Sequence, residues 1–176
     1  EFAVKASGDG IQPIIGCQVN IDFAQTNESS TSKPVKKISS PVLLLASDEA
    51  GYANLVELVS QAYLSPAETG ETLVEESWFV GKTEGVICLT GGPAGPIGAA
   101  IEAGQQAVAQ NRLERLKELF GDRLYVELQR HGSYDKRIEL ETVKLAYALN
   151  LPLVATNDAH FLKKEDYQAH DALIAI

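Results

Sequence analysis

Two patterns of apolar and polar positions recur along this chain. Short apolar runs, typical of strands buried on both faces, cover residues 42–46, 86–90, 124–129 and 151–155. A less regular run over residues 11–23 is expected to form one or two further strands. Between these runs, apolar residues recur at spacings of three and four, which is the period of an amphipathic helix. The alternation predicts an α/β fold with mostly parallel strands.

The helical period predicts several helices that pack on these strands. They are expected at about residues 1–7, 50–64, 71–79 and 99–120, in a stretch ending near Asn150, and at 166–176. Each helix should bury one apolar stripe. The stripes are Tyr52, Leu55, Val59 and Ala62 in one helix, Leu113, Leu116 and Phe120 in another, and Leu140, Val143 and Tyr147 in a third, with Trp78 packed inward from residues 71–79.

The chain is expected to form a single domain over residues 1–176. This length suffices for one hydrophobic core and is short for two, and no internal repeat or linker divides it. The Ser- and Thr-rich stretch at about residues 25–40 is predicted to be a flexible surface loop. Because the first residue is not Met, we expect the chain to begin inside a larger protein or to have been trimmed.

Charge and composition narrow the function classes. The formal net charge is −9, and no basic stripe is visible, which argues against a domain that grips nucleic acid by itself. No apolar run approaches the roughly 20 residues of a membrane span, and the first residues lack a signal pattern. Cys17 and Cys88 lie in apolar strand-like segments. Such positions suit buried, reduced thiols of a cytosolic protein better than a disulfide framework.

The segment over residues 151–160 carries the candidate chemistry. An apolar strand leads there into a polar cluster that contains Asp158 and His160. In a parallel α/β protein, sites form at the carboxyl ends of strands, and a carboxylate and an imidazole two residues apart can converge on one metal ion. A solvated loop or a helix cap would explain the same pair equally well.

Other candidates have simpler structural explanations. His131 follows a strand and is a candidate neighbour of the same site, although an ordinary hydrogen-bonded or exposed histidine is the simpler interpretation. His170 lies four residues after Asp166 in a helical pattern, which favours a surface ion pair. Glu127 is expected to point inward and to pair with a basic group. The glycine-rich stretch at 91–98 fits neither the dinucleotide fingerprint nor the P-loop, which favours a tight strand-to-helix turn.

Five ordered blocks of the sequence carry a family resemblance. They are GIQPIIGC at 10–17, LA at 45–46 with GYANL at 51–55, GVICLTG at 85–91, FGDRLYVELQRHG at 120–132 and LPLVATNDAH at 151–160. Together they resemble the polymerase-and-histidinol-phosphatase (PHP) domain found in alpha subunits of the bacterial replicative polymerase, DNA polymerase III. The resemblance implies a distorted (β/α)₇ barrel, incomplete at the amino end because the first strand, with its His-x-His motif, would precede residue 1.

The resemblance also implies that metal ligands have been lost. Gln18 stands where metal-binding members have a glutamate, and an amide binds a divalent ion more weakly than a carboxylate. Pro41 and Gly92 stand at or near positions of a histidine and a cysteine in those members. Only Asp158 and His160 match the ligand pattern, so the metal site is predicted to be vestigial, and no cofactor is expected.

Two functions from different classes remain open. In one, the domain is a non-catalytic scaffold of the replicative polymerase and binds the rest of the alpha subunit and the proofreading exonuclease in the cytoplasm. In the other, it is a phosphoesterase, acting as a 3′–5′ exonuclease or a pyrophosphatase with Zn²⁺ or Mn²⁺. Catalytic DNA synthesis is expected elsewhere in the parent chain. A barrel that lacks a strand is also expected to self-associate through exposed sheet edges, or to cover the gap with residues 25–37 or a terminus.

Overall fold

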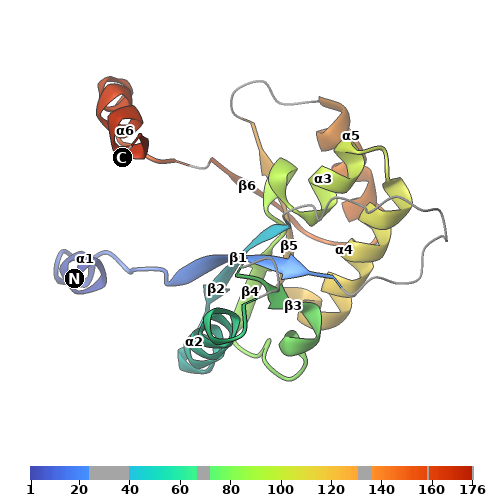
Figure 1. Ribbon diagram of the computed structural model, residues 1–176, viewed down its shortest axis with the longest axis horizontal. Coiled ribbons are helices and arrows are strands. Elements are labelled where there is room, and N and C mark those ends of the chain that lie inside the picture. The colour runs from blue at the N-terminus through green and yellow to red at the C-terminus, as the bar shows by residue number, and fades with distance from the viewer. Residues whose placement is uncertain (24–39, 67–71, 131–135, 158, 176) are drawn as a thin grey trace.

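Six strands form one mixed sheet at the centre of the molecule (Figure 1). The computed structural model describes residues 1–23, 40–66, 72–130, 136–157 and 159–175. The strands are β1 (Gly16–Asp22), β2 (Pro41–Ala46), β3 (Val74–Glu75), β4 (Val86–Leu89), β5 (Leu124–Gln129) and β6 (Leu153–Thr156). They lie in the order β3-β1-β2-β4-β5-β6. The predicted α/β class is therefore confirmed, and the predicted loop at 25–40 lies almost entirely outside the described residues.

One strand runs against the others. Strand β2 is antiparallel to both β1 and β4, whereas β1 with β3, β4 with β5, and β5 with β6 are parallel pairs. The sheet is therefore mixed, with parallel pairs in the majority. Within the described part of the chain, β3 and β6 are the two edge strands, and no ladder joins them into a closed barrel.

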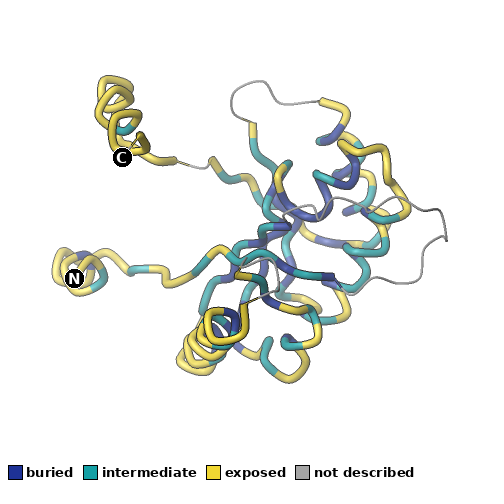
Figure 2. The backbone as a smooth tube through the Cα atoms, in the orientation of Figure 1, coloured by how far each residue is buried: buried dark blue, intermediate teal, exposed yellow. Residues whose placement is uncertain are grey.

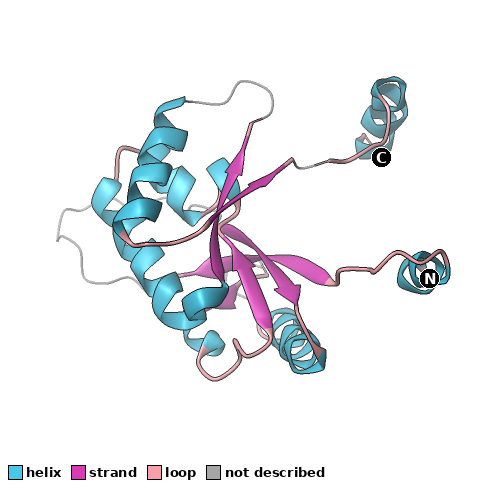
Figure 3. Cartoon of the chain, turned by 180° about the vertical axis from the view of Figure 1, so that it is seen from behind, coloured by secondary structure: helices cyan, strands magenta, loops and turns pink. Residues whose placement is uncertain are grey.

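Four helices pack against the sheet, and one helix at each terminus extends away from it. The helices are α1 (Phe2–Gly8), α2 (Glu49–Leu64), α3 (Pro96–Glu102), α4 (Gln106–Phe120), α5 (Lys136–Ala148) and α6 (Tyr167–Ile174). Helices α3, α4 and α5 form one group beside the sheet, and α2 lies below the strands in this view (Figure 3). Helices α1 and α6 stand away from this body and are mostly exposed (Figure 2). Among the described residues, no helix is long and apolar enough to cross a lipid bilayer.

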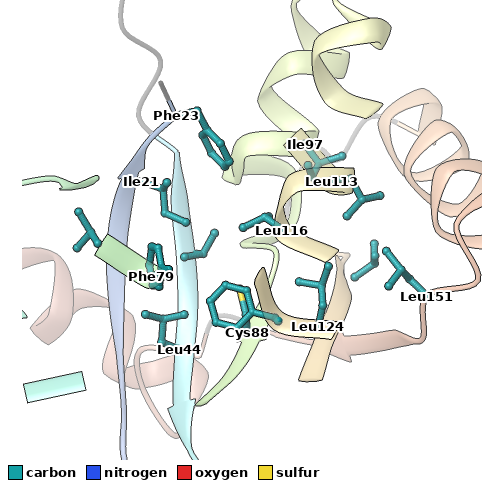
Figure 4. Close-up of a cluster of buried hydrophobic side chains, with 14 of the residues drawn as sticks. Ile21, Phe23, Leu44, Phe79, Cys88, Ile97, Leu113, Leu116, Leu124 and Leu151 are labelled. Atoms are coloured by element: carbon teal, nitrogen blue, oxygen red, sulfur yellow. The ribbon is translucent and has the colours of Figure 1, made fainter. Parts of the chain in front are cut away.

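The core lies between the helices and one face of the sheet (Figure 4). Leu44, Cys88 and Leu124 occupy neighbouring positions on β2, β4 and β5, and all three are fully buried. Leu113 and Leu116 of α4 pack toward them, as their helical spacing predicts. The predicted stripe of α4 is thus confirmed, and burial of these side chains is the main force that holds helix and sheet together.

Four local expectations were wrong. On α2, Leu55 and Ala62 are buried as predicted, but Tyr52 of the same predicted stripe is 54% exposed. Residues 71–79 do not form an amphipathic helix: β3 is followed there by a single 3-10 turn, η1 (Glu76–Phe79). The stretch at 99–120 is two helices, α3 and α4, because the chain turns at Gly104 with a positive φ of 73°. On α5 the buried face carries Ile138, Thr142 and Ala146, whereas Tyr147 is 73% exposed.

Candidate functional site

The strand register brings the lost ligand positions to one face of the sheet. Gln18 of β1 pairs with Leu43 of β2, and Leu43 pairs with Leu89 of β4. Directly paired residues project from the same face of a sheet, and so do residues two apart on one strand. Pro41, two residues before Leu43, therefore shares this face with Gln18. This is the face opposite the helix-covered core.

Close packing shows that Pro41 lies beside the turn that contains Gly92. A side-chain carbon added to Gly91 would lie 2.0 Å from the Pro41 carbonyl oxygen, so the two backbones are in contact. Gly92 has a φ of 57°, and a side-chain carbon added there would lie 2.8 Å from the Gln129 amide oxygen. The Gln129 side chain therefore fills the space in which a cysteine at position 92 would begin.

Glu127 is the buried polar centre of this region. It lies on β5, is 4% exposed and accepts a hydrogen bond of 2.9 Å from the Gly91 N–H. The Thr156 hydroxyl also donates to the Glu127 carboxylate, and the Gln129 amide donates to it over 3.2 Å. The Glu127 N–H in turn donates to the Thr90 hydroxyl at 2.9 Å. We call these five residues the Glu127 network.

The Glu127 network joins the carboxyl ends of three neighbouring strands. Thr90 and Gly91 directly follow β4, Glu127 and Gln129 belong to β5, and Thr156 ends β6. Glu127 was expected to pair with a basic group, but its partners in the described part of the chain are hydroxyls, an amide and a backbone N–H. A carboxylate that accepts several such hydrogen bonds fixes their geometry strongly. Among the described residues, these hydrogen bonds join the strand ends at the rim of the sheet.

The network also affects a buried thiol. Burial raises the pKa of Cys88 far above its ordinary value, and the nearby Glu127 carboxylate raises it further. Burial also raises the pKa of the half-buried Cys17. Both cysteines are free thiols, in agreement with the sequence. Neither thiol has the electropositive surroundings of a nucleophile or a metal ligand.

A small pocket opens beside the network. Its wall includes Gly92, Glu127 and Gln129 from the sheet rim and Glu139 and Thr142 from α5. Arg130 donates to Glu139 of this wall through two nitrogens, at 2.8 and 2.6 Å. This hydrogen bonding lowers the pKa of the Glu139 carboxyl. The ion pair links the chain just after β5 to the first turn of α5.

The predicted ligands are only partly within the described structure. Asp158 and His131 lie outside the described residues, two positions beyond Thr156 and Gln129 respectively. His160 is exposed, and its ring lies 5.2 Å from the ring of His170 on α6. Strands β2, β4 and β5 separate β1, which carries Gln18, from β6 in the sheet. A shared metal site of Asp158, His160 and Gln18 therefore stays a prediction.

Three positions on or beside this face of the sheet lack a strong metal ligand. Gln18 offers a neutral amide, Pro41 has no ligand atom, and Gln129 fills the space at Gly92. The described residues also contain no group of three or more His, Cys, Asp or Glu side chains placed to bind one ion.

Sequence reasoning missed most of the Glu127 network. No role was predicted from the sequence for Thr90, Gln129 or Thr156. Their shared role becomes visible only in the register of β4, β5 and β6. One weak signal was available. Each of the three apolar strands ends in, or is followed directly by, a polar residue with a hydrogen-bonding side chain, and parallel strands align such ends at one edge.

One protein family and several known proteins are similar to this chain over most or all of its length. The family model for the PHP domain matches residues 1–131. The whole chain aligns with DNA polymerase III subunit alpha of Caulobacter vibrioides at 42% identity, of Pseudomonas aeruginosa at 37% and of Escherichia coli at 34%. It spans only 14–15% of the length of these relatives. With three-quarters of its residues matched by one family model, the chain belongs to the PHP domain family.

Proposed function

We propose that this chain is a non-catalytic PHP domain of a replicative DNA polymerase alpha subunit. It packs against the rest of that subunit in the cytoplasm and offers a surface to the proofreading exonuclease. The observation that carries the proposal is the sheet face on which Gln18, Pro41 and Gly92 replace metal ligands and Gln129 fills the space at Gly92. Relatives named DNA polymerase III subunit alpha are 33–42% identical to the whole chain, which supports a polymerase alpha subunit as the parent protein.

The structural role rests on the Glu127 network. In metal-binding relatives, a cation would draw the ends of several strands together through charged ligands. Here the buried carboxylate of Glu127 joins β4, β5 and β6 through Gly91 and Thr156. The network supports a rigid rim of the sheet. In the sequence, His131 and Asp158 come two residues after Gln129 and Thr156 of this network. A distorted (β/α)₇ barrel is the fold that we propose for the domain.

Exposed apolar side chains support a packing role. On α1, Phe2 and Val4 are 78% and 79% exposed, and Leu162 before α6 is 98% exposed. Single exposed apolar residues are ordinary, but several of them on terminal segments that stand away from the core support a surface that another part of the protein covers. The parent chain is about seven times longer than the 176 residues of this one, so it offers ample surface to do so. The net charge of −9 disfavours strong direct DNA binding by this domain.

DNA synthesis by the parent chain tests the proposal. We expect Asp158→Ala and His160→Ala to leave nucleotidyl transfer by the parent polypeptide nearly unchanged, because no metal chemistry depends on either side chain. Elemental analysis of the dialysed 176-residue chain should find well under one bound transition metal per chain. A loss of nucleotidyl transfer in both variants at unchanged thermal stability would contradict the proposal. About one tightly held Zn²⁺ or Mn²⁺ per chain would also contradict it and would favour the metal-dependent phosphoesterase.

A further inference from the structure

Helix α2 carries two apolar stripes, and only one of them faces the core. Leu55, Leu58 and Ala62 are buried in the hydrophobic core. A second stripe, which we call the outer stripe of α2, consists of four side chains that stay partly or largely in water: Tyr52, Val56, Val59 and Tyr63. Tyr52 is 54% exposed, Val56 47% and Tyr63 71%. Packing against the sheet therefore leaves a continuous apolar surface along the flank of the same helix.

The outer stripe has the spacing of a helix-pairing seam. Its residues are separated by four, three and four positions, which is the alternation that keeps the seam of a coiled coil on one side of a helix. Spacing and residue type are the same when the helix is read in reverse. If two copies of α2 pair antiparallel, Tyr52 faces Tyr63 of the second copy, and Val56 faces its Val59. The outer stripe is therefore self-complementary about a two-fold axis.

The residues around the outer stripe permit close approach of a second helix. Ala53 and Ser60 border the stripe on one side, and both are exposed and small. The two acidic residues of α2 do not meet across the seam. Glu57 turns to Lys82, whose Nζ lies 2.5 Å from its Oε1. Glu49 begins the helix, so antiparallel pairing puts the two copies of Glu49 at opposite ends.

Helix α2 is fixed to the body of the molecule, at whose periphery it lies (Figure 1). The Asp48 carboxylate accepts a hydrogen bond of 2.8 Å from the Gly51 N–H and caps the helix. Gly51 also touches the chain before β4, because a side-chain carbon added to Gly51 would lie 1.8 Å from the Gly85 carbonyl oxygen. The Asn54 amide donates to the Glu84 carbonyl at 2.9 Å. These contacts give the outer stripe a defined orientation.

We propose that the outer stripe of α2 is a docking surface for a second copy of this domain, with the two α2 helices antiparallel. A second copy is the partner whose stripe matches this one in spacing and residue type. A fully buried tyrosine removes about 150–250 Å² from water, so the exposed fractions of the stripe leave roughly 400 Å² to be covered on each copy.

The size of this surface predicts a weak, reversible dimer. Two copies would bury roughly 800 Å² together, against about 1,600 Å² for a standard stable complex. We therefore expect a dissociation constant on the order of 0.1 mM. The inference goes beyond the proposed scaffold function and does not depend on it. It is also distinct from association through the sheet edges, because α2 lies on neither edge strand.

Photo-crosslinking in the parent polypeptide tests the pairing of the helices. Benzoylphenylalanine is placed at position 63, and isotopically light and heavy copies are mixed before irradiation. Antiparallel pairing predicts products that join a light copy to a heavy copy and that link position 63 to the segment around Tyr52. The matched control has benzoylphenylalanine at position 147, since Tyr147 of α5 is 73% exposed, and it should give no light–heavy product with α2.

Charge substitutions at Val56 test the seam in a second way. Val56→Glu and Val56→Lys each place like charges of two copies near each other, so each should weaken dimerisation in sedimentation at least about tenfold. An equimolar mixture of the two variants should dimerise more tightly than either alone. Leu140→Glu is the control, because Leu140 of α5 is 55% exposed, and it should change the dissociation constant less than about twofold. Circular dichroism should show the same helix content in all variants.

Three results would overturn the inference. Cross-links from position 63 that stay within one copy would show that the parent polypeptide itself covers the stripe. Light–heavy products that join position 63 to the same segment of the second copy would contradict antiparallel pairing. Dimerisation that is unchanged in Val56→Glu would assign self-association to the edges of β3 and β6. Metal-dependent hydrolysis tests the scaffold function separately, so failure of either proposal can be told from failure of the other.

Discussion

Replacing Glu127 tests whether hydrogen bonds hold the rim of the sheet. Glu127→Leu preserves the approximate volume but removes the acceptor for the Gly91 N–H, and an unsatisfied buried N–H costs about 1–3 kcal/mol. Gln129 loses less, because its amide also donates to the Thr156 hydroxyl at 3.1 Å, and Thr156 is only partly buried, so its hydroxyl can turn to water. Removing a buried carboxylate also removes its desolvation cost, which offsets part of the loss. We expect the free energy of unfolding to fall by about 2 kcal/mol for Glu127→Leu and about 1 kcal/mol for Glu127→Gln, whose amide oxygen still accepts one bond.

Urea unfolding followed by circular dichroism measures this change, and hydrogen exchange at Gly91 locates it. Exchange at the Gly91 amide should accelerate in Glu127→Leu more than exchange in α4 does. Glu118→Leu is the matched control, because Glu118 is an exposed residue of α4, and surface substitutions usually change stability by less than about 0.5 kcal/mol. The reasoning is refuted if Glu127→Leu and this control have the same free energy of unfolding and the Gly91 amide stays protected from hydrogen exchange.

Three further outcomes follow from the same structure. Cys88 should resist a thiol reagent at pH 8 until the chain unfolds, because burial raises its pKa, and the half-buried Cys17 should react first; equal rates would contradict this order. Arg130→Gln should raise the pKa of Glu139, measured by NMR titration. Because the pKa of Glu139 is lowered, the ion pair stabilises the folded state at a pH above the unfolded pKa of Glu139. This stabilisation is lost as the pH falls through the folded pKa, so the stability of the variant should fall less over that pH range. The chain should self-associate through the edges of β3 and β6, so a clean monomer by light scattering, with both edges unprotected in hydrogen exchange, would refute that expectation.

The sequence predicts the strands well because their signal is local. Each of the four short apolar runs overlaps a strand, and the predicted ends differ from the observed ends by at most two residues. The stripe of α4 is fully buried as expected, at Leu113, Leu116 and Phe120. Strand direction is a different matter. The antiparallel course of β2 depends on how the chain crosses between strands, and no residue pattern within residues 41–46 records that crossing.

Weak or misleading hydrophobic signals explain the errors in the helices. On α5 the buried face includes Thr142, which is polar, and Ala146, which is small, whereas the larger Leu140 and Tyr147 are exposed. A search for large apolar residues therefore selects the wrong face. Exposed apolar residues are common on protein surfaces, so periodicity assigns a helix more reliably than it assigns the buried side.

The candidate site was predictable in part. The lost ligands Gln18, Pro41 and Gly92 are read from the sequence through the family resemblance, and the structure places Pro41 beside the turn at Gly92. The partners of Glu127 were not predictable, because they come from three strands whose alignment is a tertiary property. A buried carboxylate suggests a basic partner by general expectation. Here several weaker donors together take that place.

Metal-dependent hydrolysis by the parent polypeptide tests the scaffold function most directly. The assay measures cleavage of a 3′-labelled DNA end and of pyrophosphate with added Mn²⁺ or Zn²⁺, in the absence of the exonuclease partner. Wild type, Asp158→Ala and His160→Ala are compared, with circular dichroism to show that all three are folded. The scaffold function predicts the same background hydrolysis in all three proteins. Metal-dependent hydrolysis in the wild type that disappears in both folded variants would contradict it and identify the domain as an enzyme.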